Sequence, residues 1–339
     1  MAALDISFIR TVFLQPLLTG LEKHYGINHE QLGIPARILK EPMSLIPFSE
    51  VVGWLEHVEK LTGNPAFMIN IANEIKFDKM GYLGEWFLSS PDLALAFRRI
   101  NYGTSCLQSG ATFHGEQSGN IIKWSYSTRY AKGRARLHDS LRMAIMFNHA
   151  LKHYMGDNYV PINVEISGPP CGNGLIESYF GTEIQWNAPM TKVWVDISIL
   201  EHGNNKAFNV TRPMLMSNLQ LDDFLNMPQP HDLAKVMFEM VNYSRYYGVP
   251  NIDFVADRVG LSRQQLQRRL HQYGWNFTSI TSYVLCNSAI KYMMEGMPIT
   301  EIAAALGYSN VQSFNKAFQR NRGNTPAQYQ QRLLERSRT

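Results

Sequence analysis

The chain of 339 residues has only three cysteines, which stand far apart at Cys106, Cys171 and Cys286. An odd number of distant cysteines, with no CxxC pair, argues against a disulfide framework and against a zinc site built from thiolates. Such sparing use of cysteine is typical of a reducing compartment. We therefore expect a cytoplasmic protein that carries no metal and no cofactor.

Long apolar runs and an excess of charge are also missing. No stretch approaches the roughly 20 apolar residues of a transmembrane helix, and Asp5 and Arg10 interrupt the N-terminal apolar residues, unlike a secretory signal. Charged residues make up 18% of the chain and hydrophobic residues 45%, which is enough apolar material for a packed core. The length favours two domains, and we expect no membrane contact.

Catalytic signatures are equally scarce. The sequence has no Walker A motif, no GxSxG and no complete dinucleotide fingerprint. His149 and His153 lie four residues apart and could share a metal ion, but no third ligand is evident near them. We therefore expect a protein that is not an enzyme.

The net charge of +4 is unevenly distributed. Residues 231–339 hold 13 Lys and Arg against seven Asp and Glu, whereas residues 1–230 hold 19 against 21. The positive charge of the last third indicates that this part meets a polyanion.

Residues 1–205 alternate between helical and strand patterns, which predicts an α+β domain. Apolar residues recur every three or four positions in residues 48–61, as in a helix. Gly119-Asn120 separates two short segments, the second of which alternates Ile122, Trp124 and Tyr126, as in a β-hairpin. Residues 206–231, rich in Asn, Gln, Pro and His, are interpreted as a linker. From residue 232 to residue 339 only helices are evident.

One layout occurs twice in this helical part. Residues 252–272 and 299–319 each place a short apolar helix before a glycine, Gly260 or Gly307, which is followed by a hydrophobic residue and a serine. Glycine tolerates the left-handed backbone of a tight turn, and the serine can cap the next helix. The pattern predicts two helix-turn-helix units, at about 250–272 and 298–321.

The second helix of each unit divides into an apolar and a polar side. Leu266 and Leu270, or Phe314 and Phe318, lie four apart and are expected to face the core. Glutamine and asparagine can read adenine, and arginine or lysine can read guanine, whereas other arginines hold phosphates. The predicted base-reading residues are Gln264, Gln267, Arg268, Gln312, Asn315 and Lys316, and the predicted phosphate contacts are Arg263, Arg269, Arg320 and Arg322.

The segment ITEIAAALGYSNVQSFNKAFQRNRGNTPAQY, residues 299–329, resembles the C-terminal signature of AraC/XylS-type transcription regulators. The resemblance implies a seven-helix module in which a helix at residues 277–294 joins the two units. It also implies that the base-contacting residues fall on the positions named above and, in the second unit, on Val311 as well. The two recognition helices would then enter successive major grooves about 34 Å apart. Two positions depart from the family pattern: Leu285-Cys286-Asn287 replaces a frequent early arginine, and Lys316 stands where Arg or His is usual.

The N-terminal region, from GINHEQLGIPARILK to about residue 205, resembles the arabinose-binding-type domain of the subgroup that includes ornithine-utilisation and virulence regulators. This resemblance implies a domain that senses a small molecule or forms a homodimer. Aromatic residues of this region are candidates for the lining of an effector pocket, although core packing is the alternative. The candidates are Trp86, Phe97, Tyr102, Trp124 and Tyr126.

Together these features predict an effector-responsive transcription activator that binds double-stranded DNA and acts on RNA polymerase. We expect the first helix-turn-helix unit to carry most of the sequence discrimination. One alternative is a regulator without a ligand, controlled by its abundance or by a protein partner. A more remote alternative is an enzyme with a DNA-binding tail, which would need an activated cysteine near a histidine or glutamate.

Overall fold

The computed structural model describes residues 4–203 and 218–336. The chain divides into two compact units: the N-terminal unit is Ile6–Gln229, and the C-terminal unit runs from Pro230 onward and also includes residues 4 and 5. The first unit combines helices with sheets, and the described part of the second contains helices alone. This confirms the predicted α+β domain followed by an all-α domain.

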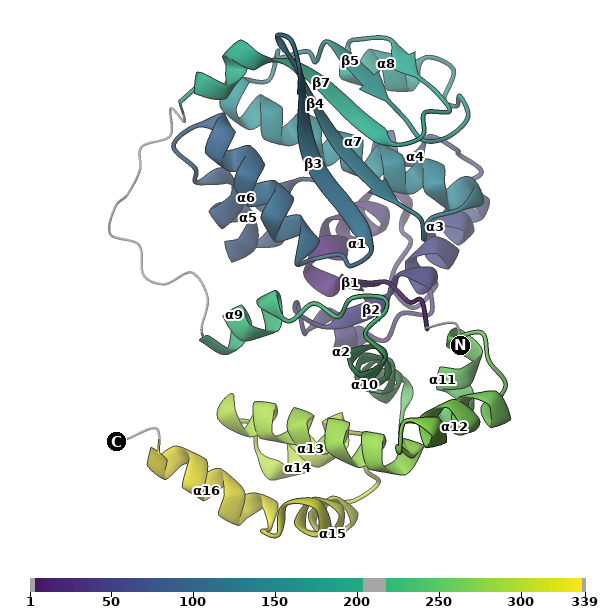
Figure 1. Cartoon of the computed structure of the whole chain (residues 1–339), viewed down its shortest axis with the longest axis vertical. Helices are drawn as coiled ribbons and strands as arrows, with labels where there is room; N and C mark the ends of the chain where they lie inside the picture. The colour runs from purple at the N-terminus through teal and green to yellow at the C-terminus, as the bar shows by residue number, and fades with distance from the viewer. Residues whose placement is uncertain (1–3, 204–217, 337–339) are drawn as a thin grey trace. The chain divides into compact units, whose positions relative to one another are not determined.

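A five-stranded sheet with the strand order β3-β4-β7-β5-β6 forms one layer of the N-terminal unit (Figure 1). Its neighbours pair antiparallel except β5 and β6, which run parallel. A separate two-stranded sheet pairs β1 with β2. The strands are β1 (Phe8–Arg10), β2 (Leu45–Pro47), β3 (Ala111–Ser118), β4 (Ile121–Thr128), β5 (Asn163–Glu165), β6 (Ile184–Gln185) and β7 (Thr191–Asp196).

Helices pack against one face of this sheet, and others contact the strands of the small one. The α-helices of the N-terminal unit are α1 (Thr11–Tyr25), α2 (Ala36–Leu39), α3 (Phe48–Thr62), α4 (Phe67–Asn70), α5 (Tyr82–Leu88), α6 (Leu93–Ser105), α7 (Gly133–Met155), α8 (Leu175–Phe180) and α9 (Asn218–Leu225). Two 3₁₀ helices are η1 (Phe77–Met80) and η2 (Ile197–Glu201).

The predicted hairpin is confirmed as β3 and β4, with Gly119 at φ 60° in the turn between them. Ile122, Trp124 and Tyr126 all point into the core, as their alternation predicts. The long helix α7 lies behind the sheet (Figure 1), and its Phe147 stacks on Trp124 with ring centroids 3.9 Å apart. The core of the unit therefore lies between this face of the sheet and α7.

A buried polar cluster joins α7 to the sheet. The Tyr126 hydroxyl donates to Asp139 at 2.5 Å and accepts a hydrogen bond from Gln108 at 2.9 Å. Arg142, 1% exposed, donates to the same carboxylate at 2.8 Å and lies over the ring of Phe13. Because buried charges are tolerated only when paired, these groups fix how α7 sits on the sheet.

The stretch expected to be a linker is partly folded. Its residues 206–217 lie outside the described residues, whereas α9 packs within the N-terminal unit. Arg10, itself buried, donates to the main-chain carbonyls of Asp223 and Phe224, and the Phe224 ring meets Trp86 edge to face. The apolar and hydrogen-bonding partners of α9 are far away in sequence, so the composition of the stretch concealed them.

The C-terminal unit has seven α-helices among its described residues, in agreement with the implied seven-helix module. They are α10 (Leu233–Ser244), α11 (Ile252–Arg258), α12 (Arg263–Gln272), α13 (Phe277–Met294), α14 (Ile299–Ala305), α15 (Val311–Arg322) and α16 (Pro326–Arg336), with a 3₁₀ turn, η3 (Arg245–Tyr247), after α10. The joining helix predicted at residues 277–294 is α13.

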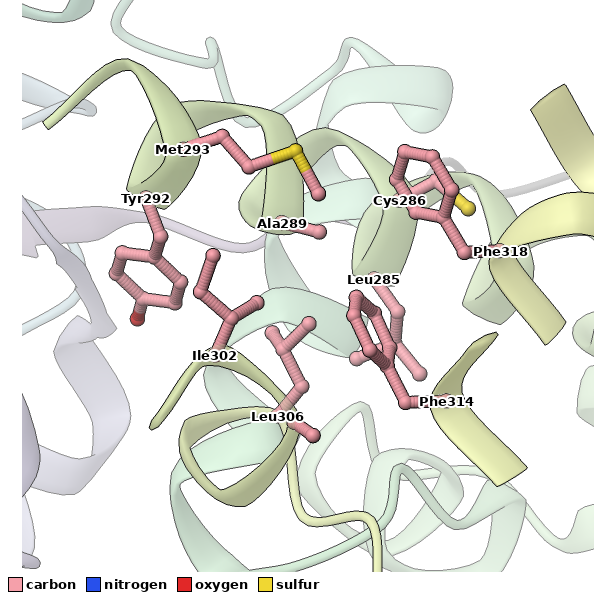
Figure 2. Close-up of a cluster of buried hydrophobic side chains, with 10 residues drawn as sticks. Leu285, Cys286, Ala289, Tyr292, Met293, Ile302, Leu306, Phe314 and Phe318 are labelled. Carbon is pink, nitrogen blue, oxygen red and sulfur yellow. The ribbon is translucent and has the colours of Figure 1, made fainter. Parts of the chain in front are cut away.

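The second half of this unit is built around α13. Figure 2 shows side chains of α13, α14 and α15 pointing toward one another in one apolar cluster. Phe314 and Phe318 of α15 are both at most 2% exposed and belong to this cluster. The cluster comprises Leu285, Cys286, Ala289, Tyr292, Met293, Ile302, Ala303, Leu306, Phe314 and Phe318.

Over residues 4–203 and 218–336, no helix is long and apolar enough to cross a membrane. Within the same ranges, no three His, Cys, Asp or Glu side chains gather as metal ligands would. Nε2 of His149 instead lies 2.9 Å from the carbonyl oxygen of Ala72.

Gly84 provides a test of how tightly α5 packs on η1. A Cβ at this position would lie 1.8 Å from the carbonyl oxygen of Phe77, whereas a Cβ at Gly53 in α3 would meet nothing within 4 Å. We expect Gly84→Ala to lower the free energy of unfolding by at least about 2 kcal/mol, because main-chain atoms must move to make room. Gly53→Ala should raise it by about 0.5–1 kcal/mol through helix propensity.

Urea denaturation followed by far-ultraviolet circular dichroism measures both effects. Equal stabilities of wild type and Gly84→Ala would contradict the close approach of the two helices.

Candidate nucleic-acid interface

The first helix-turn-helix unit consists of α11 and α12, joined by residues 259–262. Gly260 adopts φ 68° in this turn, a left-handed conformation that suits glycine. Ser262 accepts a hydrogen bond from the main-chain N–H of Gln265 at 3.2 Å, and the Gln265 side chain accepts one from the N–H of Ser262 at 2.8 Å. This reciprocal capping box fixes the first residue of α12, and Ser262 caps the helix as predicted.

The second unit consists of α14 and α15, and its turn is one residue longer. Gly307 adopts φ 82°, but the cap of α15 is Asn310, not Ser309 as the sequence comparison predicted. The Oδ1 atom of Asn310 accepts from the N–H of Ser313 at 2.8 Å. Asparagine caps helices as well as serine does, so local chemistry allowed either start, and the longer turn decided it.

The extra turn residue determines which residues of the two recognition helices occupy equivalent positions. Counted from their caps, Leu266 and Leu270 of α12 occupy the positions of Phe314 and Phe318 of α15, and all four are buried. An alignment on the two glycines alone is therefore shifted by one residue within these helices. The predicted core and reading positions correspond only when they are counted from the caps.

The polar side of α12 is open to solvent. Gln264, Gln267 and Arg268 are all exposed, and they lie two, five and six residues after the cap. At 3.6 residues per turn, these positions share the side of the helix opposite Leu266 and Leu270. The first unit thus presents two amides and one guanidinium together.

The polar side of α15 is less fully exposed. Gln312 and Lys316 are exposed, but Val311 packs against the apolar cluster of α13–α15. Asn315 is half-buried, and its Oδ1 atom has no hydrogen-bond partner among the described residues. Two of the four predicted reading residues of this unit therefore stand free to meet a base edge.

The four arginines predicted to hold phosphates differ in their surroundings. Arg263 pairs with Asp253 at 3.0 Å, in a bridge whose two side chains are 56% and 57% exposed. Arg320 is exposed, and Arg269 is half-buried. Arg322 donates to Oδ1 of Asn287 on α13 at 2.5 Å. Arg322 therefore ties the end of α15 to the joining helix.

Two models of known families match this chain. One is described as "Arabinose-binding domain of AraC transcription regulator, N-term" and matches residues 29–204; the other, "Helix-turn-helix domain", matches residues 255–332. The chain belongs to the AraC family of transcription regulators. Both resemblances inferred from sequence are thereby confirmed.

Three known proteins are similar to all or part of this chain. Regulatory protein SoxS of Escherichia coli and of Salmonella typhimurium is 33% identical over 87 residues, which cover 24% of this chain and 79% of SoxS. The crystal structure of the transcriptional regulator CdpR from Pseudomonas aeruginosa is similar over 94% of this chain and 98% of its own, at 16% identity and a TM-score of 0.42. A DNA-binding transcriptional dual regulator from Escherichia coli K-12 covers 29% of this chain and 93% of its own, at 20% identity and a TM-score of 0.27.

The five aromatic residues proposed for an effector pocket of this AraC-family chain have different environments. Phe97 and Trp124 are buried against each other, with ring centroids 4.2 Å apart, and Tyr126 belongs to the buried polar cluster. Trp86 is half-buried, and Tyr102 is 58% exposed. Core packing therefore accounts for Phe97, Trp124 and Tyr126, and the assignment of the five side chains to an effector pocket stays a prediction.

Sequence reasoning missed three polar residues that shape the interface: Asp253, Asn287 and Asn310. The asparagine at the start of α15 carried a readable signal, since asparagine is a preferred cap. The other two carried none, because their partners, Arg263 and Arg322, lie 10 and 35 residues away in the chain.

Arginines 320 and 322 offer a matched test of phosphate binding. We expect Arg320→Gln to reduce the slope of log K against log salt by about one, because an exposed arginine that meets a phosphate releases one counterion. Arg322→Gln should leave the slope unchanged, because its guanidinium already binds Asn287. Fluorescence anisotropy with a labelled duplex at several salt concentrations measures both slopes, and equal losses in the two variants would contradict this assignment.

Proposed function

We propose that this AraC-family regulator is an effector-responsive activator that reads two successive major grooves with α12 and α15. The carrying observation is that exposed polar residues occupy matching positions after the caps of both helices. Gln264, Gln267 and Arg268 do so on α12, and Gln312 and Lys316 on α15. The opposite side of each helix is anchored in the core, so the polar side is the one that DNA can meet.

The chemistry of these side chains suits base edges in the major groove. A glutamine amide can pair with N6 and N7 of adenine, and an arginine can pair with O6 and N7 of guanine. Lysine supplies charge without a planar fork, so Lys316 makes a less directional contact than Arg268. We therefore infer that α12 supplies most of the sequence discrimination and that α15 adds anchoring and a softer preference.

The joining helix supports simultaneous binding by both units. Helix α13 has 18 residues, which corresponds to a rod about 27 Å long at 1.5 Å per residue. That length is comparable with the roughly 34 Å between successive major grooves on one side of DNA. The apolar cluster of Figure 2 fastens α14 and α15 to this rod.

The N-terminal unit is proposed to bind a small effector and to form a homodimer, and RNA polymerase is the proposed partner on DNA. Membership of the AraC family supports these roles. The matching model is named after arabinose, but that name describes other proteins. A regulator that has no ligand would show no thermal stabilisation by any small molecule.

The raised pKa values of the cysteines favour a transcription regulator over an enzyme that uses a thiol as acceptor. Burial raises the pKa of Cys106 and of Cys286, and it raises the pKa of Cys171 to about 11. Cys171 lies near Glu59 and Arg134, but the effect of burial outweighs that of the arginine. A protonated thiol is a poor nucleophile at neutral pH.

Paired substitutions in the two recognition helices test the proposal. We expect Gln267→Ala/Arg268→Ala to reduce the ratio of specific to non-specific affinity by about 30-fold to 10⁴-fold, since each of the two bidentate contacts discriminates by roughly 1–3 kcal/mol. Gln312→Ala/Lys316→Ala should reduce the ratio less. The ratio is measured by gel shift, with a duplex selected by the wild-type protein and a scrambled duplex of the same composition.

A matched control removes the same two residue types from an exposed site outside the recognition helices. Gln331→Ala/Arg332→Ala on α16 should leave the ratio near its wild-type value. An unchanged ratio in the α12 variant, or an equal loss in the α16 control, would contradict the assignment of the exposed polar residues of α12 to base contacts. Transcription in vitro from a promoter bearing the selected duplex tests activation separately.

A further inference from the structure

A cavity of about 330 Å³ opens in the N-terminal unit between η1 and the C-terminal half of α7. Phe77, Leu88 and Ala150 give it an apolar floor, and each of these residues is at most 8% exposed. Its volume lies at the lower end of the range of about 300–1,000 Å³ that is typical of small-molecule sites. The cavity therefore suits a compact ligand.

Two lysines of opposite walls give the cavity its charge. Lys76, just before η1, and Lys152, in the last turn of α7, both line it and are half-buried. Neither ammonium group has an ion pair or a hydrogen bond among the described residues. Since partly desolvated ammonium groups are stabilised by a counter-charge, these two are suited to bind a carboxylate.

The acidic residues of the cavity limit the charge of its ligand. Asp78 and Asp157 line it, but both are exposed, so they stand at its edge. The two exposed carboxylates offset only part of the attraction of the two half-buried lysines. They would repel a ligand with several negative charges, such as a phosphate, more strongly than a single carboxylate or a zwitterion.

His149 adds a hydrogen-bond acceptor. Burial, with a contribution from Lys76, lowers the pKa of His149 to about 4, so the ring is neutral at pH 7. Its Nε2 atom lies 2.9 Å from the carbonyl oxygen of Ala72, which can only accept, so Nε2 carries the proton. Nδ1 is then the unprotonated nitrogen of a side chain that lines the cavity, so it can accept a hydrogen bond from a ligand with a donor group.

We propose that this cavity binds a small organic acid with a hydroxyl or amino group, its carboxylate held by Lys76 and Lys152 and its donor group by Nδ1 of His149. The inference rests on the proposed function, in which the N-terminal unit senses an effector. It places the site and names the chemical class of the ligand. The cavity adjoins η1, against which α5 packs at Gly84, so an occupied cavity stiffens the same part of the unit.

Calorimetric titration and thermal melting of the full chain test this proposal. The probes are 2-hydroxy and 2-amino acids from lactate to norleucine, with the neutral lactamide as the control ligand. We expect at least one acid to raise Tm in a dose-dependent manner, as a ligand selective for the native state must, and lactamide to have no effect. Lys76→Met and Lys152→Met should each weaken binding of that acid at least 10-fold.

Lys79→Met is the matched control, because Lys79 is an exposed lysine of η1 that does not line the cavity. It should leave Kd unchanged.

The proposal is overturned if no acid binds at 10 mM, if all three lysine variants weaken binding equally, or if Lys76→Met and Lys152→Met have no effect. DNA is absent from this assay. A chain that reads its duplex but binds no acid therefore contradicts the cavity alone, and a chain that binds an acid but reads no duplex contradicts the proposed function alone.

Discussion

The anchoring of each recognition helix by two apolar residues four positions apart is the constraint on which the DNA-binding unit depends. Leu266 and Leu270 hold α12, and Phe314 and Phe318 hold α15. A helix fixed along one stripe has no freedom to rotate about its axis, so the buried pair determines which side chains face outward. The caps then set the first residue of each helix and, with it, the position of each outward residue along the helix axis. Specificity in this unit is thus a property of the core as much as of the surface.

The N-terminal unit uses its aromatic residues for a different task. Trp124 stacks on Phe147, and Tyr126 joins Asp139 and Arg142 in a paired polar cluster under the sheet. These groups fasten α7 to β4 and leave little room between them. The cavity lies instead near the far end of α7, where charged residues outnumber aromatic ones. In this unit, therefore, the residues that fasten α7 to the sheet are not the ones that line the cavity.

The sequence was sufficient to predict what depends on local periodicity. The β3–β4 hairpin, the joining helix α13 and the buried stripes of α12 and α15 all follow from spacing, because one face of each element must be apolar. Features made by distant partners were not predictable. Asn287 holds Arg322, and Arg10 holds α9, across 35 and more than 200 residues. The one-residue difference between the two turns was hidden for another reason: Ser309 and Asn310 are both good caps, and only the packing of the following helix distinguishes them.

The hydrogen bonds from Arg10 to the main chain of α9 also fix the length of a tether. Because α9 belongs to the N-terminal unit, only residues 226–232 lie between its last residue and the first of α10. Seven residues span at most about 25 Å when fully extended. A single buried guanidinium near the start of the chain thereby shortens the connection between the two units to these seven residues.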